Sequence, residues 1–436
     1  MITNIKADRH FLFDPAATYL MKVMINGEPS ISDLKNAIIT AVSKHDILNS
    51  KILFDAAGEA YYVPSEGVTI PDIEVFDRIL SHKEIVNRAA KRRFDLQHGE
   101  MVRFIICQEE DKVEMTAIIH HIAGDGKSLL ILIQDIMNEL QNPSEICEKK
   151  NRDVKVVDEE YVSQFVELSP FLESVIEDTN KKWQEEEVIF DYDDYKESFE
   201  EYWSDKTINA DSFTLKDDEL KEVLLLCKRH GVTLNNLIIT LIKQSLGESK
   251  KMAVVADTRE KGNGSMGNYA EMVLTEEAYD YTKNFWENVN YTDKFVKEQI
   301  KDRKQLLLST LIRNKVAAGI NDAVNIHSYQ SKLVEEYKDS LYVGKEGLPV
   351  MLSNIGVAPI KQAYGQYSIE NILFVSPLCT DTHCNVAVIT INNTFILNMI
   401  TYEGEHTYEN ILKDVREGMC ELIKAEAGFE SKFVYM

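Results

Sequence analysis

The chain is poor in the residues that mark several protein classes. Its 436 residues include only nine prolines and 19 glycines, which excludes collagen-like and proline-rich disordered chains. Its six cysteines are sparse, and Cys107 lies in an apolar segment, so we expect reduced thiols in a cytoplasmic protein rather than a disulfide framework. No apolar run reaches the ~18 residues that a membrane span needs. The first fifteen residues carry charges and lack the apolar segment of a secretory signal.

Positive charge is also in short supply. Lysine and arginine total 48 against 72 aspartate and glutamate residues, which gives a formal net charge of −24. Such a polyanion repels phosphate backbones, so we expect no nucleic acid partner. Ten of the acidic residues fall within 185–205, together with a single lysine and six aromatic residues. A solvated linker or surface helix is one interpretation, while the aromatic residues favour a segment that packs on the rest of the protein.

The length and the hydrophobic content of 44% predict about two domains with sizeable cores. Both halves of the chain combine amphipathic helices with β-rich runs. Ser32 is the expected N-cap of a helix over 33–45, and Thr233 and Thr407 are expected to cap two further helices. The sequence therefore predicts two α+β lobes, divided as an N-terminal lobe over 1–165, an acidic junction over 166–211 and a C-terminal lobe over 212–436.

Two β-rich runs, 101–108 and 113–120, flank a polar turn of sequence EEDK and predict a hairpin. Apolar residues between 128 and 140 then recur at a helical period. His120 and His121 therefore lie where a core strand ends and a glycine-containing loop opens. A second hairpin is predicted around the Asn-Asn pair at 392–393.

The loop sequence HHIAGDG, residues 120–126, fits the pattern HHxxxDG. Chance alone produces such a match in roughly one chain in a thousand of this composition. A neutral imidazole accepts a proton near neutral pH, and a histidine at the end of a strand is rigidly placed. Asp125 can fold back to pair with a cation or bond the imidazole directly, and Gly126 allows close backbone approach. The alternative interpretation is a pair of buried core histidines.

The motif resembles the signature of the chloramphenicol-acetyltransferase-like superfamily, and most closely that of nonribosomal peptide synthetase condensation domains and related alcohol acyltransferases. Further segments are similar to the same domains, among them 31–54, 94–108, 231–246, 257–274 and the sequence LSNIG at 352–356. The resemblance implies an α+β fold in which two lobes form a V-shaped pseudo-dimer with a tunnel between them.

The resemblance also implies roles for individual residues. His121 is expected to deprotonate the acceptor, and Gly126 to keep space next to the base. His120 is counted with the candidate catalytic residues of the motif, and if its role is packing, its substitution should cost less than that of His121. Asp125 is expected to form a structural ion pair with an arginine, for which Arg9 is the first candidate and Arg103 and Arg259 are the alternatives. Ser353 and Asn354 are candidate substrate-binding residues that would hydrogen-bond the tetrahedral oxyanion or the tunnel wall, and the alternative is an ordinary polar pair at a β-turn or strand end.

Together these observations predict a free-standing acyltransferase. It would move an acyl group from a coenzyme A or carrier-bound phosphopantetheine thioester to a hydroxyl or amine acceptor, and an acyl carrier protein stays open as a partner. The alternative is a catalytically idle condensation-like module that binds a carrier protein or another subunit. We expect no bound cofactor. We also expect no metal, because the spacing of Cys379, His383 and Cys384 fits no common zinc pattern. The DFGWG motif of plant acyltransferases is absent from the sequence.

Overall fold

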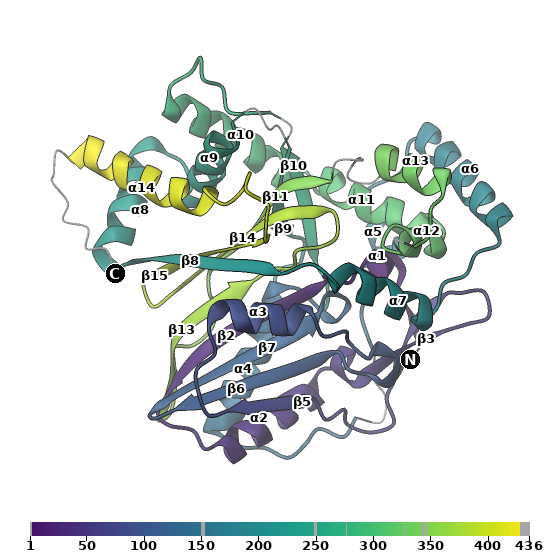
Figure 1. Cartoon of the computed structure of the whole chain (residues 1–436), viewed down its shortest axis with the longest axis horizontal. Helices are drawn as coiled ribbons and strands as arrows, with labels where there is room; N and C mark the ends of the chain where they lie inside the picture. Colours follow the sequence, from purple (N-terminus) through teal and green to yellow (C-terminus); the bar gives the residue numbers. More distant parts are fainter. Residues whose placement is uncertain are drawn as a thin grey trace.

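The computed structural model describes residues 2–427 except for 150–152, 248–250, 276, 327, 342–343 and 345–346. The described chain forms two six-stranded mixed sheets, a small three-stranded sheet and helices that cover them (Figure 1). The α+β class predicted from the sequence is confirmed. None of the described helices combines the length and the apolar character that crossing a bilayer requires.

The first large sheet is built mainly from the N-terminal third of the chain. The predicted hairpin is confirmed in it as two antiparallel strands, and the second of them is buried along nearly its whole length. In spatial order the strands are β12 (Ala363–Tyr364), β13 (Tyr367–Val375), β2 (Thr18–Asn26), β7 (Lys112–His120), β6 (Val102–Glu109) and β5 (Asp72–Phe76).

The second large sheet comes from the C-terminal half. Its predicted hairpin is also confirmed, and Asn392 and Asn393 make the tight turn with φ of 51° and 55°, a left-handed conformation that asparagine tolerates. In spatial order the strands are β10 (Ala270–Thr275), β9 (Met252–Asp257), β11 (Leu348–Val357), β14 (Thr382–Ile391), β15 (Thr394–Tyr402) and β8 (Ile208–Lys216).

One β-hairpin from the C-terminal half of the chain joins the first large sheet. Strands β12 and β13 follow β11 in sequence, yet β13 pairs with β2 of the first sheet before the chain returns to the second sheet as β14. The C-terminal lobe expected over 212–436 therefore contributes a hairpin to the sheet of the N-terminal half. A second link is made by α3 (His82–Ala90), whose Asn87 side chain pairs with both backbone groups of Ile208 on edge strand β8.

Amphipathic helices bury one face of each large sheet (Figure 1). In α4 (Gly126–Gln141), the apolar positions expected from the sequence are buried. The N-cap of α2 (Ile31–Lys44) is Ser30 rather than the predicted Ser32, because the Ser30 hydroxyl accepts the bond from the Asp33 amide at 3.0 Å. Beside the second sheet lie α8 (Asp217–His230), α9 (Leu234–Leu246), α10 (Phe285–Lys301) and α14 (Ile411–Ala427).

Thr233 caps α9 as predicted, since its hydroxyl accepts a bond from the Asn236 amide at 3.2 Å. The last helix starts at Ile411, four residues beyond the cap expected at Thr407.

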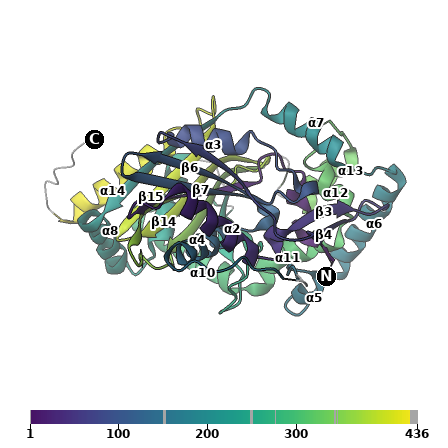
Figure 2. The ribbon, with the colours of Figure 1, turned by 90° about the horizontal axis from the view of Figure 1, so that it is seen from below.

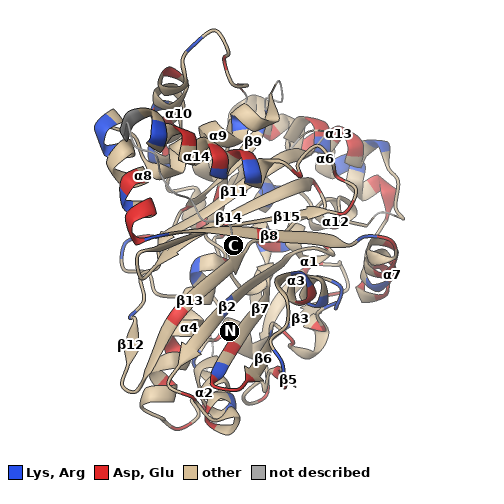
Figure 3. Ribbon diagram, turned by 60° about the vertical axis from the view of Figure 1, so that its left-hand side comes forward, with Lys and Arg blue, Asp and Glu red and all other residues tan. Residues whose placement is uncertain are grey.

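The acidic segment forms the end of α6 (Pro170–Glu186) and α7 (Tyr192–Trp203), which lie along one side of the molecule (Figure 2). Tyr195 stacks on Phe13 with ring centroids 5.3 Å apart, and the Trp203 indole donates to the Pro15 carbonyl at 2.9 Å. The interpretation that its aromatic residues pack is confirmed. Acidic residues are frequent on this and the other outer helices, while the sheets are largely uncharged (Figure 3).

The remaining elements pack beside α6 and α7. They are the small sheet of β1 (Thr3–Asn4), β4 (Ala60–Pro64) and β3 (Ser50–Phe54), and the helices α1 (Arg9–Leu12), α5 (Glu159–Val162), α11 (Arg303–Lys315), α12 (Ala318–Ala323) and α13 (Lys332–Leu341). Their apolar side chains join those of the first large sheet in one continuous core, whereas most of the second sheet and its helices share another.

Candidate active site

The HHxxxDG loop links the end of a central strand to the start of a buried helix. β7 ends at His120, one short turn covers His121–Ala123, and α4 begins at Gly126. Asp125 is the N-cap of α4, where its Oδ1 accepts a hydrogen bond from the Ser128 amide at 3.0 Å. Gly124 has a φ of 152°, and a Cβ there would lie 2.5 Å from Ser128 Cβ, so the sharp entry into the helix requires glycine.

His121 is held between aromatic rings. Its imidazole stacks on Phe11 at 3.6 Å between centroids and meets the edge of Tyr19 at 4.7 Å. The residue is 4% exposed, and its Nδ1 has no hydrogen-bond partner of normal geometry in the described chain. Burial lowers the pKa of His121 to about 4, although the Asp125 charge opposes that shift. The imidazole is therefore neutral at pH 7 and able to accept a proton.

His120 has different surroundings. Its ring meets the edge of Phe94 at 5.5 Å, and its Nδ1 accepts a hydrogen bond from the Ile122 amide at 3.3 Å. Burial lowers the pKa of His120 to about 3. These contacts fit a packing role, in which the imidazole fixes the turn that presents His121.

Asp125 pairs with Arg259, which comes from the segment between β9 and β10. Arg259 Nη1 donates to Asp125 Oδ2 at 2.7 Å and Nη2 donates to Oδ1 at 2.8 Å, a bidentate geometry. The Tyr269 amide donates to Oδ2 at 3.0 Å. Although burial alone would raise the pKa of Asp125, Arg259 and these backbone donors hold it below its usual value. Both carboxylate oxygens are thus engaged, and no hydrogen bond joins Asp125 to His121 in the described chain.

The first-choice partner predicted for Asp125, Arg9, is therefore wrong. Arg9 lies on α1 and forms a buried ion pair with Asp322 of α12, with both N···O distances at 2.6 Å. The alternative Arg103 does not reach Asp125 either, because it donates to the Arg92 carbonyl at 2.7 Å and covers the ring of Phe94. The third candidate, Arg259, is the partner.

Neighbouring contacts extend this ion pair into a latch between the motif loop and residues 257–269. Lys127 pairs with Asp257 at 2.6 Å. The Ser128 hydroxyl donates to the Gly267 carbonyl at 2.9 Å and accepts from the Gly267 amide at 3.1 Å. The second sheet thus fixes the orientation of a loop that belongs to the first.

A small cavity of about 50 Å³ lies beside this latch and is lined by several predicted site residues. Tyr19, Asp125, Gly126, Ser353 and Asn354 all line it. The Ser353 hydroxyl makes no hydrogen bond within the described chain and is free to donate. The Asn354 side chain is partly engaged, since its Nδ2 donates to Asn235 at 2.9 Å and its Oδ1 accepts from the Gly356 amide at 2.8 Å. Each of these atoms keeps one further hydrogen-bonding position, so both predicted substrate-binding residues retain polar groups at the cavity.

Gly126 is constrained by its neighbours. A Cβ at this position would lie 2.7 Å from Phe374 Cζ and 3.0 Å from Ile355 Cδ1. The space that this glycine keeps is therefore filled by side chains of β13 and β11, and it lets the start of α4 approach both sheets.

Phe11 and Tyr19 are the site residues that the sequence did not reveal. Both are aromatic residues in apolar surroundings, so their pattern is that of ordinary core residues. Tyr19 neighbours the Thr18–His120 pair of the β2–β7 register, and that register becomes known only when the two strands are paired in space.

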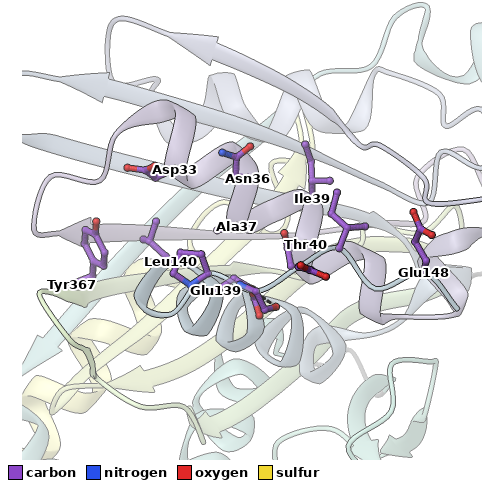
Figure 4. Close-up of a pocket in the computed structure, with 13 residues that line it drawn as sticks. Asp33, Asn36, Ala37, Ile39, Thr40, Glu139, Leu140, Glu148 and Tyr367 are labelled. Carbon is purple, nitrogen blue, oxygen red and sulfur yellow. Dashed lines mark hydrogen bonds between the residues drawn. The ribbon is translucent and has the colours of Figure 1, made fainter.

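A larger cavity of about 1020 Å³ lies elsewhere, between α2 and α4 (Figure 4). Asp33, Asn36 and Thr40 line it from α2 and Glu139 from α4, but no residue of the HHxxxDG motif reaches it. The Glu139 carboxylate is already engaged by Lys44 and by Ser144. Within the described ranges, no group of three His, Cys, Asp or Glu side chains is arranged to hold a metal ion.

Comparison with known proteins agrees with this geometry at the level of the fold. No curated protein matches the chain significantly. The first condensation domain of the calcium-dependent antibiotic synthetase superposes with a TM-score of 0.65 at 11% identity, covering 97% of this chain and 96% of that one. Polyketide synthase associated protein 5 from Mycobacterium tuberculosis gives 0.64 at 11% identity, covering 98% and 100%.

The epimerization domain from the third module of tyrocidine synthetase B gives a TM-score of 0.61 at 12% identity, covering 96% of this chain and 92% of that one. Domains named for different reactions thus share this fold, so the chemistry must be argued from the site. A profile of the family described as Condensation domain matches residues 10–256, more than half of the chain. The chain therefore belongs to the condensation-domain family.

Proposed function

We propose that this protein is an acyltransferase that uses His121 as its general base. The observation that carries the proposal is the state of the His121 imidazole, which is neutral, clamped between two aromatic rings and adjacent to the cavity-lining Tyr19. A buried base held this way loses little freedom when the acceptor binds.

The proposed reaction is a direct transfer. His121 removes the proton from an acceptor hydroxyl or amine, and the acceptor heteroatom attacks the thioester carbonyl carbon. The carbonyl oxygen becomes an oxyanion, toward which the free Ser353 hydroxyl can donate. When the carbon–sulfur bond breaks, the imidazolium returns its proton to the thiolate. Asp125 takes no part in proton transfer and keeps the loop in place through Arg259.

For the donor we favour a coenzyme A thioester over a carrier-bound phosphopantetheine thioester. Carrier proteins are usually acidic, and a chain with a net charge of −24 has an unfavourable long-range field for them. Coenzyme A is anionic as well but small, so a local group of basic side chains suffices to attract it.

The test is a mass-spectrometric screen of the purified protein against a panel of acyl-coenzyme A donors and pooled acceptors. General-base catalysis contributes ~10²–10⁴ in rate, so His121→Ala should lose at least ~100-fold in acyl transfer. His120→Ala is the matched control and should lose less, since its contacts fit a packing role. Equal transfer by the parent protein and His121→Ala would contradict the assignment.

The same screen separates an enzyme from a catalytically idle binding module. An idle module would leave every thioester intact, with and without acceptor, yet bind a carrier protein in a pull-down. Transfer from carrier-bound thioesters alone would instead keep the acyltransferase assignment and overturn the choice of donor.

A further inference from the structure

A third cavity, of about 620 Å³, lies in the C-terminal half and is lined from edge strand β10 and from helices α10 and α11. Its volume falls within the range of sites that bind small molecules. Much of its lining is apolar, from Met272, Leu274, Phe295, Leu306, Leu308 and Ile312.

Lys243 reaches this cavity from α9 and is unusual among the lysines of the chain. It is only 6% exposed, and within the described part of the chain it makes no hydrogen bond and no ion pair. Lysine is almost never buried this far without a partner, because desolvating an ammonium group is costly. Burial lowers the pKa of Lys243 to about 8, and Glu277 opposes that shift. At neutral pH most of the population is still charged.

We propose that this cavity is a binding site for an aliphatic monocarboxylate, whose carboxylate pairs with Lys243 and whose chain contacts the apolar lining. Lys243 is the one basic side chain among the described residues that line the cavity. A carboxylate would supply the partner that its ammonium lacks, through charge-assisted hydrogen bonds. Glu277, the acidic side chain of the lining, is exposed and accepts a hydrogen bond from Tyr291, and within the described residues no ion pair joins it to Lys243.

The inference does not rest on the proposed transfer reaction. Strand β10 contributes Ala270 to the small cavity beside Asp125 and Met272 to this third one, so the two sites share a strand but differ in their functional groups. Binding can therefore be measured in a protein whose catalytic base has been removed.

The test uses isothermal titration of the whole protein with decanoate, decan-1-ol and decyltrimethylammonium as probes of equal chain length. Decanoate should bind with one site per chain and at least about tenfold more tightly than either other probe. Lys243→Met keeps the length of the side chain and removes its charge, and it should weaken decanoate binding at least tenfold. Lys304→Met, an exposed lysine on α11 outside the cavity, and His121→Ala should bind decanoate like the parent protein.

A second measurement observes decanoate binding in the parent protein itself and uses the Met variant only to assign one resonance. In protein whose lysines carry ¹³C-methyl groups, decanoate should shift the resonance that is missing from Lys243→Met. Equal affinity for decanoate in the parent and in Lys243→Met, equal affinity for decanoate and decan-1-ol, or no shift of that resonance would each overturn the proposal.

Discussion

The ion pair between Asp125 and Arg259 offers a quantitative test of the site geometry. Asp125→Ala leaves an Arg259 side chain that is 6% exposed without its main carboxylate partner. Removing one member of a buried pair costs about 3–5 kcal/mol, because the remaining charge stays desolvated. Asp257 lies 3.2 Å from the same guanidinium and is 29% exposed, so it offsets part of this cost. We expect a loss near the lower limit, about 3 kcal/mol of unfolding free energy.

The assay is a double-mutant cycle in urea, with Asp125→Ala, Arg259→Ala and the double variant followed by fluorescence and circular dichroism. Since the two residues are in direct contact, the loss in the double variant should fall short of the summed single losses by about 1–3 kcal/mol. The exposed pair Arg78 and Glu84 is the matched control, with side chains 53% and 46% exposed. Its coupling should be about 0–1 kcal/mol, as for other surface pairs.

Activity in the same variants distinguishes a brace from a catalytic dyad. If Asp125 braces the loop, stability and acyl transfer should fall together in Asp125→Ala, and Arg259→Ala should reproduce both defects. Suppose instead that Asp125→Asn keeps the parent midpoint but loses transfer as severely as His121→Ala. The carboxylate would then act directly on the imidazole, and the brace would be refuted.

Further predictions follow from individual contacts. Gly126→Ala should cost about 1–3 kcal/mol in urea unfolding, because its Cβ would crowd Phe374, whereas Gly264→Ala, with no atom within 4 Å of the added Cβ, should be close to neutral. The acid limb of kcat/KM should lie near pH 4 rather than 6.5, because burial lowers the pKa of His121 to about 4. The pKa of His121 is near 6.5 in the unfolded state but about 4 in the folded state, so the unfolded state binds the proton first as pH falls. The free energy of unfolding should therefore decrease between pH 6.5 and pH 4, and this decrease should be smaller in His121→Ala. Phe11→Ala removes the ring stacked on His121 and leaves the imidazole free to move, so kcat should fall even under conditions in which urea unfolding shows the variant to be fully folded.

Much of the fold could be predicted from local patterns. The hairpins β6–β7 and β14–β15 follow from β-rich apolar runs around short turns, and the α9 cap at Thr233 follows from one side chain. The β12–β13 crossover could not be predicted in this way. Its pairing with β2 joins Ile372 to Val23, far apart in sequence, and any apolar strand of similar length carries the same pattern.

The candidate site shows the same difference between local patterns, which the sequence reveals, and long-range contacts, which it does not. The motif located His120, His121, Asp125 and Gly126 because these residues lie within one loop, and their spacing is local. The prediction that Arg9 pairs with Asp125 is wrong because the sequence carries no signal for which carboxylate a buried arginine meets. Arg9 and Arg259 are each buried against an aspartate, and their partners follow from the packing of α1 on α12 and of residues 257–269 on the motif loop.

The residues that complete the hydrogen bonds of Asp125 therefore lie outside the HHxxxDG motif. Within the loop, Asp125 accepts only from Ser128, which would leave one oxygen of a buried carboxylate without a donor. The bonds that complete it come from Arg259 and from the Tyr269 amide, 134 and 144 residues away. A buried carboxylate left half-satisfied is costly, so the loop conformation that presents His121 depends on the segment between β9 and β10. Changes in that segment that leave every motif residue intact can thus displace His121, so we expect the proposed acyl transfer to be lost when the latch is broken even though HHxxxDG is retained.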